Sequence, residues 1–322
     1  MVLFLTEYFR LNGLGHLRRC IAFSELFESK GIKTQILVNT DHDDAEIFNS
    51  DLKQQNWLVQ NQLETRYEAI IIDSYRAQSI DYEHFKQYTN HLVAIDDDKR
   101  IEYPSGSIIY NGGLGGLVYQ YEVNRYKKIL VGPEFALLRQ EFRENRVEKK
   151  INQTVERILI TMGGSDPLHL TSKMIPFYHS EFPSSQLDVI IGPGFSDFKE
   201  EEFHHCPYLT FYRNLDARSM CELMLRVDLC ITAGGQTIYE LGKLGIPFIV
   251  IQTAENQKGN ISGLIKSGVI ESYVDPSKGD FFVSLSQLSQ KLAIVSARQK
   301  MSTELKMIFQ IKSLDIVGSI LN

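Results

Sequence analysis

The sequence lacks any long run of basic residues, and its formal net charge is −6. Proteins that bind nucleic acid usually carry a basic patch, because contacts to phosphate supply much of their affinity. We therefore expect no nucleic-acid partner. With 43% hydrophobic and 23% charged residues, the composition is otherwise that of an average globular protein.

Cysteine is scarce, and the four cysteines have no CxxC spacing. This pattern predicts neither a zinc site nor a disulfide framework, but reduced thiols in a cytosolic protein. The amino-terminal apolar run lacks the basic start and the length of a signal peptide. No window approaches the ~20 apolar residues of a transmembrane helix. We expect a soluble, cytoplasmic protein without an integral membrane segment.

The 322 residues are enough for two domains of ordinary size. Short apolar runs alternate with helical patterns, which favours parallel sheets with helices on both faces. The charged stretch 139–153 predicts a linker between an N-terminal α/β domain, 1–150, and a C-terminal α/β domain, 151–322, whose last dozen residues cross back onto the first. The predicted fold class is α/β, with two doubly wound, Rossmann-like domains facing a central cleft. The expected strands are 2–5, 34–38, 69–72, 92–95, 107–110, 128–131, 157–161, 187–191, 209–212, 227–231 and 248–251.

The most informative motif is Ala233-Gly-Gly-Gln-Thr-Ile-Tyr-Glu240, between a predicted strand and a predicted helix over 238–244 that Gly245 ends. Glycines let backbone N–H groups approach a phosphate, and a helix N-terminus favours negative charge. Glu240, in the first turn of the helix, could reach the hydroxyls of a ribose. The pattern indicates a nucleotide-sugar pocket, although an ordinary strand–turn–helix crossover would also tolerate two glycines.

A similar turn, Gly163-Gly164-Ser165, follows the predicted strand 157–161, and Pro167 suits the first turn of a helix. Its amides and the Ser165 hydroxyl could also bind phosphate. Each glycine turn alone is a weak signal. Several such turns at strand ends predict a cleft lined with amide donors.

In the first half, Asn12-Gly-Leu-Gly-His16 precedes a predicted helix over 17–29. The helix dipole disfavours a cation at this end, so we expect His16 to be neutral near pH 7, the form that a general base needs. His16 could equally cap the helix within a glycine-rich turn. Arg19 could hold a diphosphate or form an ordinary surface ion pair.

Acidic residues follow two other predicted strands, at Asp73 and at 96–98. Three consecutive aspartates could suggest a metal, but adjacent side chains diverge, and acidic strand exits are common solvated turns. His204-His205-Cys206 has no second ligand pair at a workable distance, so a surface loop is favoured. Trp57 is expected in the core. We predict no metal and no cofactor.

In this order, the motifs resemble the UDP-sugar hydrolases of pseudaminic acid biosynthesis and the related spore-coat polysaccharide proteins (PseG and SpsG). That family has the GT-B glycosyltransferase fold and is related to the transferase that adds N-acetylglucosamine to lipid I. The resemblance covers nearly the whole chain. It rests on Gly13-Leu-Gly-His-Leu-Arg-Arg-Cys20, Asp73-Ser-Tyr75, Ile95-Asp-Asp97, Gly132-Pro-Glu-Phe-Ala-Leu-Leu-Arg-Gln-Glu-Phe142, Met162-Gly-Gly-Ser-Asp-Pro167, Ala233 to Glu240, Gly245-Ile-Pro247 and Ala254-Glu-Asn-Gln257.

The resemblance implies metal-independent hydrolysis of a UDP-linked diacetamido-dideoxy sugar, which releases UDP and free sugar for nonulosonic acid or surface polysaccharide biosynthesis. His16 would be the base that activates water, Tyr75 and Asn256 would hold the sugar, and Glu240 would bind the ribose. The implied diphosphate contacts are Gly163, Gly164, Ser165, Gly235 and Thr237. The expected substrate-binding set also includes Gly13, Gly15, Arg19, Gly234 and Gln257. No protein partner is implied.

The chain departs from the family at the end of its first strand, where an Arg-x-Asp is replaced by Leu5-Thr6-Glu7. This change leaves the identity of the sugar open. It also leaves open a GT-B glycosyltransferase that uses a UDP-sugar donor, with the loop 110–118 lining an acceptor groove. The same loop as a flexible lid would suit a hydrolase. A third reading is a protein that binds a nucleotide sugar without turning it over.

Overall fold

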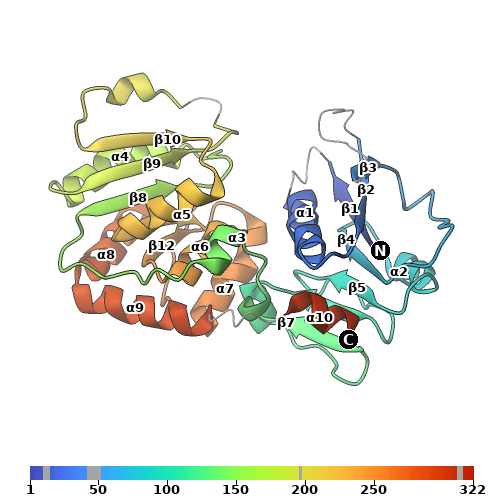
Figure 1. Ribbon diagram of the computed structural model, residues 1–322. Helices are drawn as coiled ribbons and strands as arrows, with labels where there is room; N and C mark the ends of the chain where they lie inside the picture. Colours follow the sequence, from blue (N-terminus) through green and yellow to red (C-terminus); the bar gives the residue numbers. More distant parts are fainter. Residues whose placement is uncertain (10–14, 42–51, 196–197, 310–314) are drawn as a thin grey trace. The chain divides into compact units, whose positions relative to one another are not determined.

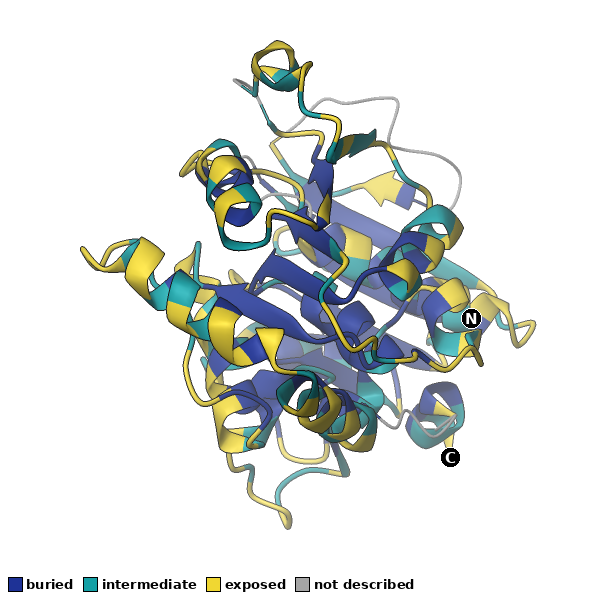
Figure 2. Cartoon of the chain, turned by 90° about the vertical axis from the view of Figure 1, so that its left-hand side faces the viewer, coloured by how far each residue is buried: buried dark blue, intermediate teal, exposed yellow. Residues whose placement is uncertain are grey.

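The computed structural model describes residues 1–9, 15–41, 52–195, 198–309 and 315–322. The chain forms two compact units (Figure 1). Unit 1 comprises Met1–Leu137 with Lys312–Asn322, and unit 2 comprises Leu138–Ile311. Each unit is built around its own parallel sheet, whose strands are mostly buried (Figure 2).

The sheet of unit 1 has seven parallel strands in the order β3-β2-β1-β4-β5-β6-β7. The predicted strands are present within a few residues. Strand β3 escaped prediction because Leu52 is its only buried residue, so it has no apolar run. The strands are β1 (Val2–Tyr8), β2 (Thr34–Thr40), β3 (Leu52–Gln54), β4 (Ala69–Asp73), β5 (Leu92–Ile95), β6 (Ile108–Asn111) and β7 (Lys128–Val131).

Helices cover both faces of this sheet, as the alternation of side chains along β1 requires. Val2 and Phe4 pack in one core with α1 (Gly15–Glu28), whereas Leu3 and Leu5 pack in the other with α2 (Ser79–Lys86). The C-terminal helix α10 (Ile316–Leu321) joins the α1 core through its apolar residues. The short helices η1 (Leu114–Leu117) and η2 (Pro133–Phe135) follow β6 and β7.

The sheet of unit 2 has five parallel strands in the order β10-β9-β8-β11-β12. They are β8 (Arg157–Thr161), β9 (Gln186–Ile191), β10 (Leu209–Arg213), β11 (Leu229–Ala233) and β12 (Phe248–Ile251). Its helices are α3 (Gln140–Glu144), α4 (Leu170–Glu181), η3 (Glu200–Phe203), α5 (Ala217–Arg226), α6 (Thr237–Leu244), η4 (Glu255–Gln257), α7 (Lys258–Lys266), α8 (Phe281–Ala293) and α9 (Val295–Ile308).

Two details of unit 2 differ from expectation. The strand predicted at 227–231 begins two residues later, because Val227 ends α5 and the Asp228 carboxylate accepts the N–H groups of Glu156 and Arg157. The stretch 139–153, for which we expected a linker, contains α3, whose Phe142 is fully buried. This aromatic anchor makes the stretch part of unit 2.

In each sheet the strand order reverses direction at one place, between β1 and β4 in unit 1 and between β8 and β11 in unit 2. Connections leave such a point toward opposite faces, so a crevice opens past the carboxyl ends of the two strands. Each unit therefore has one place at which its fold favours a ligand.

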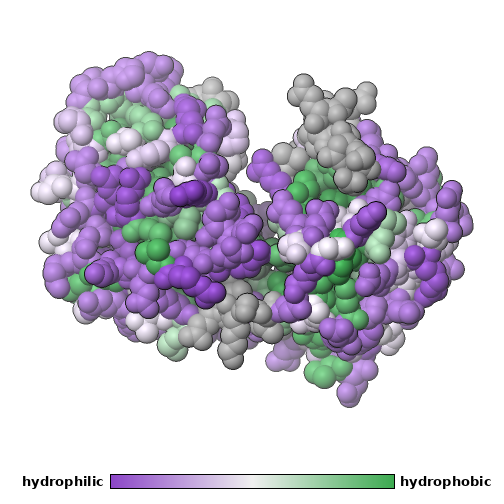
Figure 3. Space-filling model, in the orientation of Figure 1, coloured by the Kyte–Doolittle hydropathy of each residue, from purple (hydrophilic) through white to green (hydrophobic). Residues whose placement is uncertain are grey.

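In the part of the chain that the structure describes, no helix combines the length and apolarity needed to cross a bilayer. The visible face of each unit is mostly hydrophilic, with apolar side chains in small separate areas (Figure 3).

We predict that Gly242→Ala lowers the free energy of unfolding by about 1–3 kcal/mol, because a Cβ there would lie 2.4 Å from the ring of Phe309 and overpack α6. Urea denaturation measures the change. Gly279→Ala is the matched control, since a Cβ at that position meets no described atom within 4 Å. Equal stability of the two variants would contradict the packing argument.

Candidate active site

The crevice of unit 1 holds a buried histidine–carboxylate pair. His16 is the second residue of α1, and Asp73 is the last residue of β4. Because β1 and β4 pair in parallel, the start of α1 and the end of β4 meet at the same edge of the sheet. His16 Nδ1 lies 2.6 Å from Asp73 Oδ1, and both side chains are buried. The pair thus presents the other imidazole nitrogen, Nε2, away from the carboxylate.

Arg19, one turn further along α1, is bound by protein carboxylates. Its Nε and Nη2 donate to Asp73 at 2.8 Å, and its Nη1 and Nη2 donate to Asp97 at 2.6 and 2.8 Å. The sequence left Arg19 open between a diphosphate contact and an ion pair. The structure shows the ion pair, and it is a double one that includes a buried carboxylate rather than a simple surface contact.

We expected the helix dipole to disfavour the cationic form of His16, but the surroundings of the ring favour that form. Burial opposes the imidazolium and lowers the pKa, but the charge of Asp73 and its hydrogen bond outweigh that effect, so the pKa of His16 is raised above its ordinary value of 6.5. The helix dipole on which the prediction relied is a smaller influence than a carboxylate at 2.6 Å. Burial would raise the pKa of Asp73, yet Arg19 and His16 hold it well below its usual range.

Tyr75, two residues after the end of β4, lies beside this pair. Its ring meets the His16 ring edge to face, with 4.4 Å between centroids and 89° between planes. Its hydroxyl lies 3.3 Å from Asp97 Oδ2, and the side chain is 39% exposed. Burial and the charge of Asp97 raise the pKa of Tyr75, so it stays a hydrogen-bond donor.

The residues at the departure from the family, Leu5, Thr6 and Glu7, are all fully buried. Leu5 packs in the apolar core with Trp57, as expected for that tryptophan, and the Trp57 indole N–H donates to the carbonyl of Thr6 at 2.7 Å. None of the three side chains is exposed at the rim. Of the two predicted loop glycines, Gly13 lies outside the described residues, and Gly15 is the exposed first residue of α1.

The aspartates at 96 and 97 point to different partners. Asp96 is buried and accepts the Tyr121 hydroxyl at 2.8 Å and the Lys99 N–H at 2.9 Å, whereas Asp97 faces Arg19. Among the described residues, no group of three or more His, Cys, Asp or Glu is arranged to hold a metal.

The crevice of unit 2 is a pocket of about 380 Å³ past the ends of β8, β11 and β12. Most of the predicted diphosphate and sugar contacts line it. The lining residues from the prediction are Gly163, Gly164, Ser165, Gly235, Thr237, Asn256 and Gln257. The sequence motifs from three separate loops therefore meet in one place.

The glycines of this pocket differ in what they supply. Gly163 has φ +82, a conformation that L residues rarely adopt, so it forms the turn itself. At Gly164 and Gly235 a Cβ would meet no described atom within 4 Å, so the missing side chains leave room for a ligand at the backbone. Gly192, which sequence reasoning missed, packs against the carbonyls of Gly163 and Gly164. The feature of the sequence that could have identified Gly192 is the Gly-Pro-Gly directly after the strand predicted at 187–191.

The helix expected to start near Pro167 begins later, at Leu170. The buried Asp166 carboxylate accepts the N–H groups of Leu170 and Thr171 at 3.0 and 2.7 Å. These donors of α4 are therefore already satisfied, and the carboxylate supplies the negative charge that the helix N-terminus favours. The amides of the glycine turn, the N-terminus of α6 and the start of η4 also lie at the pocket.

Gln257 supports the second glycine turn as well as lining the pocket. Its Oε1 accepts the N–H groups of Thr253 at 2.9 Å and Gly234 at 3.3 Å. Asn260, also missed from the sequence, donates to the carbonyl of Gly234 at 3.0 Å and pairs with the Tyr239 hydroxyl. These contacts make Gln257 a positioning residue for the turn, while the side chain of Asn256 is exposed at the pocket.

Glu240 lies in α6, is 7% exposed, and does not line this pocket. Its Oε1 accepts Arg139 Nε at 2.8 Å, and the Arg139 guanidinium lies over the Phe142 ring at 4.9 Å. Burial raises the pKa of Glu240, and Arg139 opposes the shift. Sequence reasoning quoted Arg139 within a motif but assigned it no role.

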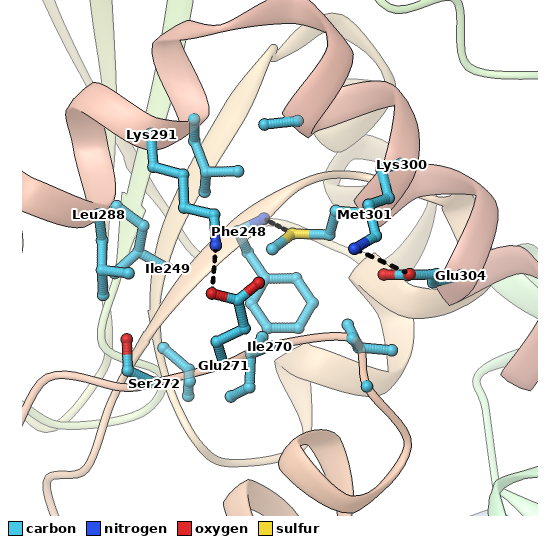
Figure 4. A pocket seen from close by; sticks show the side chains of 15 residues that line it. Phe248, Ile249, Ile270, Glu271, Ser272, Leu288, Lys291, Lys300, Met301 and Glu304 are labelled. Atoms are coloured by element: carbon cyan, nitrogen blue, oxygen red, sulfur yellow. Dashed lines mark hydrogen bonds and ion pairs between the residues drawn. The ribbon is translucent and has the colours of Figure 1, made fainter.

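A second pocket of about 70 Å³ lies near the amino-terminal end of β12 (Figure 4). Apolar side chains from β12, α8 and α9 line it, and the ion pairs Lys291–Glu271 and Lys300–Glu304 border it. None of the described residues that line it belongs to the predicted site. It also lies at the wrong end of the parallel strands for an anion, because helix N-termini gather at the carboxyl ends.

No protein-family model matches the chain. Three curated proteins are similar to it. An uncharacterised protein of Methanocaldococcus jannaschii is 24% identical over 84% of this chain and 59% of its own length. A pseudaminic acid cytidylyltransferase and UDP-2,4-diacetamido-2,4,6-trideoxy-β-L-altropyranose hydrolase of Helicobacter pylori is 25% identical over 79% of this chain and 44% of its own length. The spore coat polysaccharide biosynthesis protein SpsG of Bacillus subtilis is 23% identical over 76% of this chain and 75% of its own.

These relatives confirm the resemblance to PseG and SpsG. The chain spans about half the length of the first two relatives. Among solved structures, MurG of Acinetobacter baumannii matches with a TM-score of 0.65 at 12% identity, over 99% of both chains. A glycosyltransferase of kitacinnamycin matches with a TM-score of 0.61 at 12% identity, over 100% of this chain and 99% of the other. The GT-B fold class predicted from the sequence is confirmed.

We predict that Asp73→Asn moves the pKa of His16 from above 6.5 to below it. Once the carboxylate is gone, burial and Arg19 both lower this pKa, and the smaller effect of Glu7, which raises it, does not offset them. In the wild type, the stabilisation from the charged pair is fully present below pH 6.5 and is lost as pH rises through the raised pKa. Titration of the histidine ring resonances by NMR measures the shift. His91, in the same unit, is the internal reference, and an unchanged His16 titration in a folded variant would contradict the electrostatic account.

Proposed function

We propose that this chain hydrolyses a UDP-linked diacetamido-dideoxy sugar, releasing UDP and free sugar for the biosynthesis of a nonulosonic acid or surface polysaccharide. Two relatives support an enzyme of nucleotide-sugar metabolism: one is named for this hydrolysis and the other for polysaccharide biosynthesis. The observation that carries the proposal is the buried His16–Asp73 pair at the crevice of unit 1. It is an arrangement suited to a general base.

In this proposal Asp73 accepts the Nδ1–H of His16, which leaves the lone pair on Nε2. Nε2 takes a proton from water as the water oxygen bonds to the anomeric carbon, and the bond from that carbon to the UDP oxygen breaks. The raised pKa makes the imidazolium a stable product of the transfer. Activity should therefore rise with pH through the pKa of His16, because the base works only in its neutral form.

The pocket of unit 2 would bind the leaving group. Backbone amides at Gly164 and Gly235 and the N-terminus of α6 suit a diphosphate, whose growing charge they would stabilise without a metal. The exposed Asn256 side chain and the Tyr75 hydroxyl would contact the sugar. Glu240, whose carboxylate is paired with the Arg139 guanidinium, would accept the ribose hydroxyls.

The second candidate is a GT-B glycosyltransferase that passes the sugar to an acceptor hydroxyl instead of water. The observation that favours it is Leu5, which is buried in an apolar core where the resemblance places an arginine near the sugar. The same histidine could deprotonate a sugar hydroxyl, so the base alone does not separate the two reactions.

We predict that the wild type releases UDP from a UDP-linked diacetamido-dideoxy sugar without an acceptor, and that His16→Ala lowers kcat on the order of 10²- to 10⁴-fold because it removes the base. Phosphorus NMR follows UDP release across a panel of UDP-linked amino sugars, and ¹⁸O water shows where the new oxygen goes. Label on the sugar is the expected result.

His84→Ala is the matched control, because His84 lies in α2 and contacts the Phe85 ring and the Asn61 carbonyl rather than the pair. UDP binding with no acceptor-free turnover across the panel would reject the hydrolase for these donors and favour the transferase. Full activity in His16→Ala would reject His16 as the base in either reaction.

We predict that Glu240→Gln weakens UDP binding by about tenfold or more, because it replaces a charged acceptor of two hydroxyls with a neutral amide. Isothermal titration calorimetry with UDP measures the effect without turnover. Glu222→Gln, an exposed carboxylate on α5, is the control. Equal affinities of the two variants would remove Glu240 from the nucleotide site.

A further inference from the structure

The carboxylate of Glu7 lies beneath the turn that carries Tyr75. Glu7 is fully buried near the end of β1. Its Oε2 accepts the Ser74 hydroxyl at 2.5 Å, and its Oε1 accepts the Tyr75 backbone N–H at 3.1 Å. A single side chain from β1 thus holds two successive residues that follow β4.

The rest of this turn, residues 74–77, is tied in the same way. Ser74 Oγ accepts the N–H groups of Arg76 and Ala77, both at 3.0 Å. Arg100 Nη2 donates to the carbonyls of Ser74 and Ala77 at 3.2 and 2.7 Å. With these groups satisfied inside the protein, the turn has a fixed backbone from which Tyr75 projects.

A second contact to the turn comes from Phe9, the residue just after β1. The guanidinium of Arg76 lies 3.6 Å from the centre of the Phe9 ring, two residues beyond Glu7. Positions two apart on an extended chain point to the same side. The chain at the end of β1 and just beyond it therefore holds the turn at two places on the same side.

We infer that Glu7 is a positioning residue that sets the placement of Tyr75 against His16. The inference rests on the proposed function, in which these two side chains flank the sugar. Glu7 stands where the resemblance implies an aspartate. The turn covers Glu7, so Glu7 does not contact the substrate. The methylene that it has in addition to an aspartate acts by setting the position of the Tyr75 backbone.

The geometry explains why the side-chain length matters. An aspartate would withdraw the carboxylate by one methylene from both donors, and the turn would have to follow it to keep the bonds. A glutamine would keep the length but offer an N–H₂ group where a second acceptor is needed, and Ser74 Oγ already accepts two N–H groups. Both changes therefore move or loosen the turn.

The first experiment tests the positioning without any turnover. NMR measures the hydrogen exchange of the Tyr75 amide and the ring-current shift of the His16 ring protons in wild type, Glu7→Asp, Glu7→Gln and Ser74→Ala. We expect faster amide exchange in all three variants and displaced His16 resonances in Glu7→Asp and Ser74→Ala. These two keep the charge of Glu7, whereas Glu7→Gln also removes a charge that raises the pKa of His16. Asp188→Asn, which removes another fully buried carboxylate far along the chain, is the matched control and should change neither.

The second experiment is a double-mutant cycle with Tyr75→Ala in the acceptor-free UDP-release assay. We predict that Glu7→Gln lowers kcat/KM on the order of 10- to 100-fold, because it displaces Tyr75 by up to about 1 Å. If Glu7 acts through Tyr75, Glu7→Gln costs little more in the Tyr75→Ala background. Additive losses would overturn the inference.

The two experiments separate the possible failures. Unchanged Tyr75 exchange and His16 resonances in a folded Glu7 variant would overturn the positioning role whatever the enzyme does. If no panel sugar is hydrolysed but the resonances move as expected, the hydrolase proposal fails while the positioning of Tyr75 by Glu7 stands. Ser74→Ala removes one of the two bonds to Glu7, together with the bonds that Ser74 Oγ accepts from Arg76 and Ala77, so it tests the turn if the Glu7 variants do not fold.

Discussion

The buried carboxylate of Asp73 is the interaction on which the unit 1 site depends. An isolated buried carboxylate is costly, and this one is stabilised because His16 and Arg19 surround it. These contacts orient the imidazole of His16 and use the hydrogen-bond donors of Arg19. The charge of Asp73 also raises the pKa of His16. Arg19 in turn holds Asp97, which the Tyr75 hydroxyl faces. One charge thus organises the base, its cation and the neighbouring aromatic residue.

The pocket of unit 2 follows a different principle, in which backbone geometry does the work. The reversal of strand order between β8 and β11 opens the crevice, and glycines leave its amides accessible. Side chains mainly hold the turns in place. Gln257 and Asn260 hold Gly234 from both sides, and Asp166 caps α4, while the N-terminus of α6 lies at the pocket. A pocket built this way suits an anion without a metal.

The prediction from the sequence succeeded where the signal is local. Apolar runs in the sequence located every described strand except β3. Gly245 ends the predicted helix, α6, in the left-handed conformation expected of a helix cap. Motifs after strand ends located most of the lining of the unit 2 pocket, because the carboxyl ends of parallel strands meet at one edge. Prediction failed for the start of α4, where a capping aspartate delays the helix beyond a proline that suits a first turn.

The sequence by itself determined the fold class and which loops carry the glycines, the histidine and the tyrosine, because periodicity and turn chemistry are properties of neighbouring residues. Only the tertiary structure decided which charges face one another. His16 and Asp73 are 57 positions apart, Arg19 and Asp97 are 78 apart, and Arg139 and Glu240 are 101 apart. Protonation depends on burial and on charges within a few ångströms, so the charge state of His16 and the hidden role of Glu7 became visible only once the strands were paired.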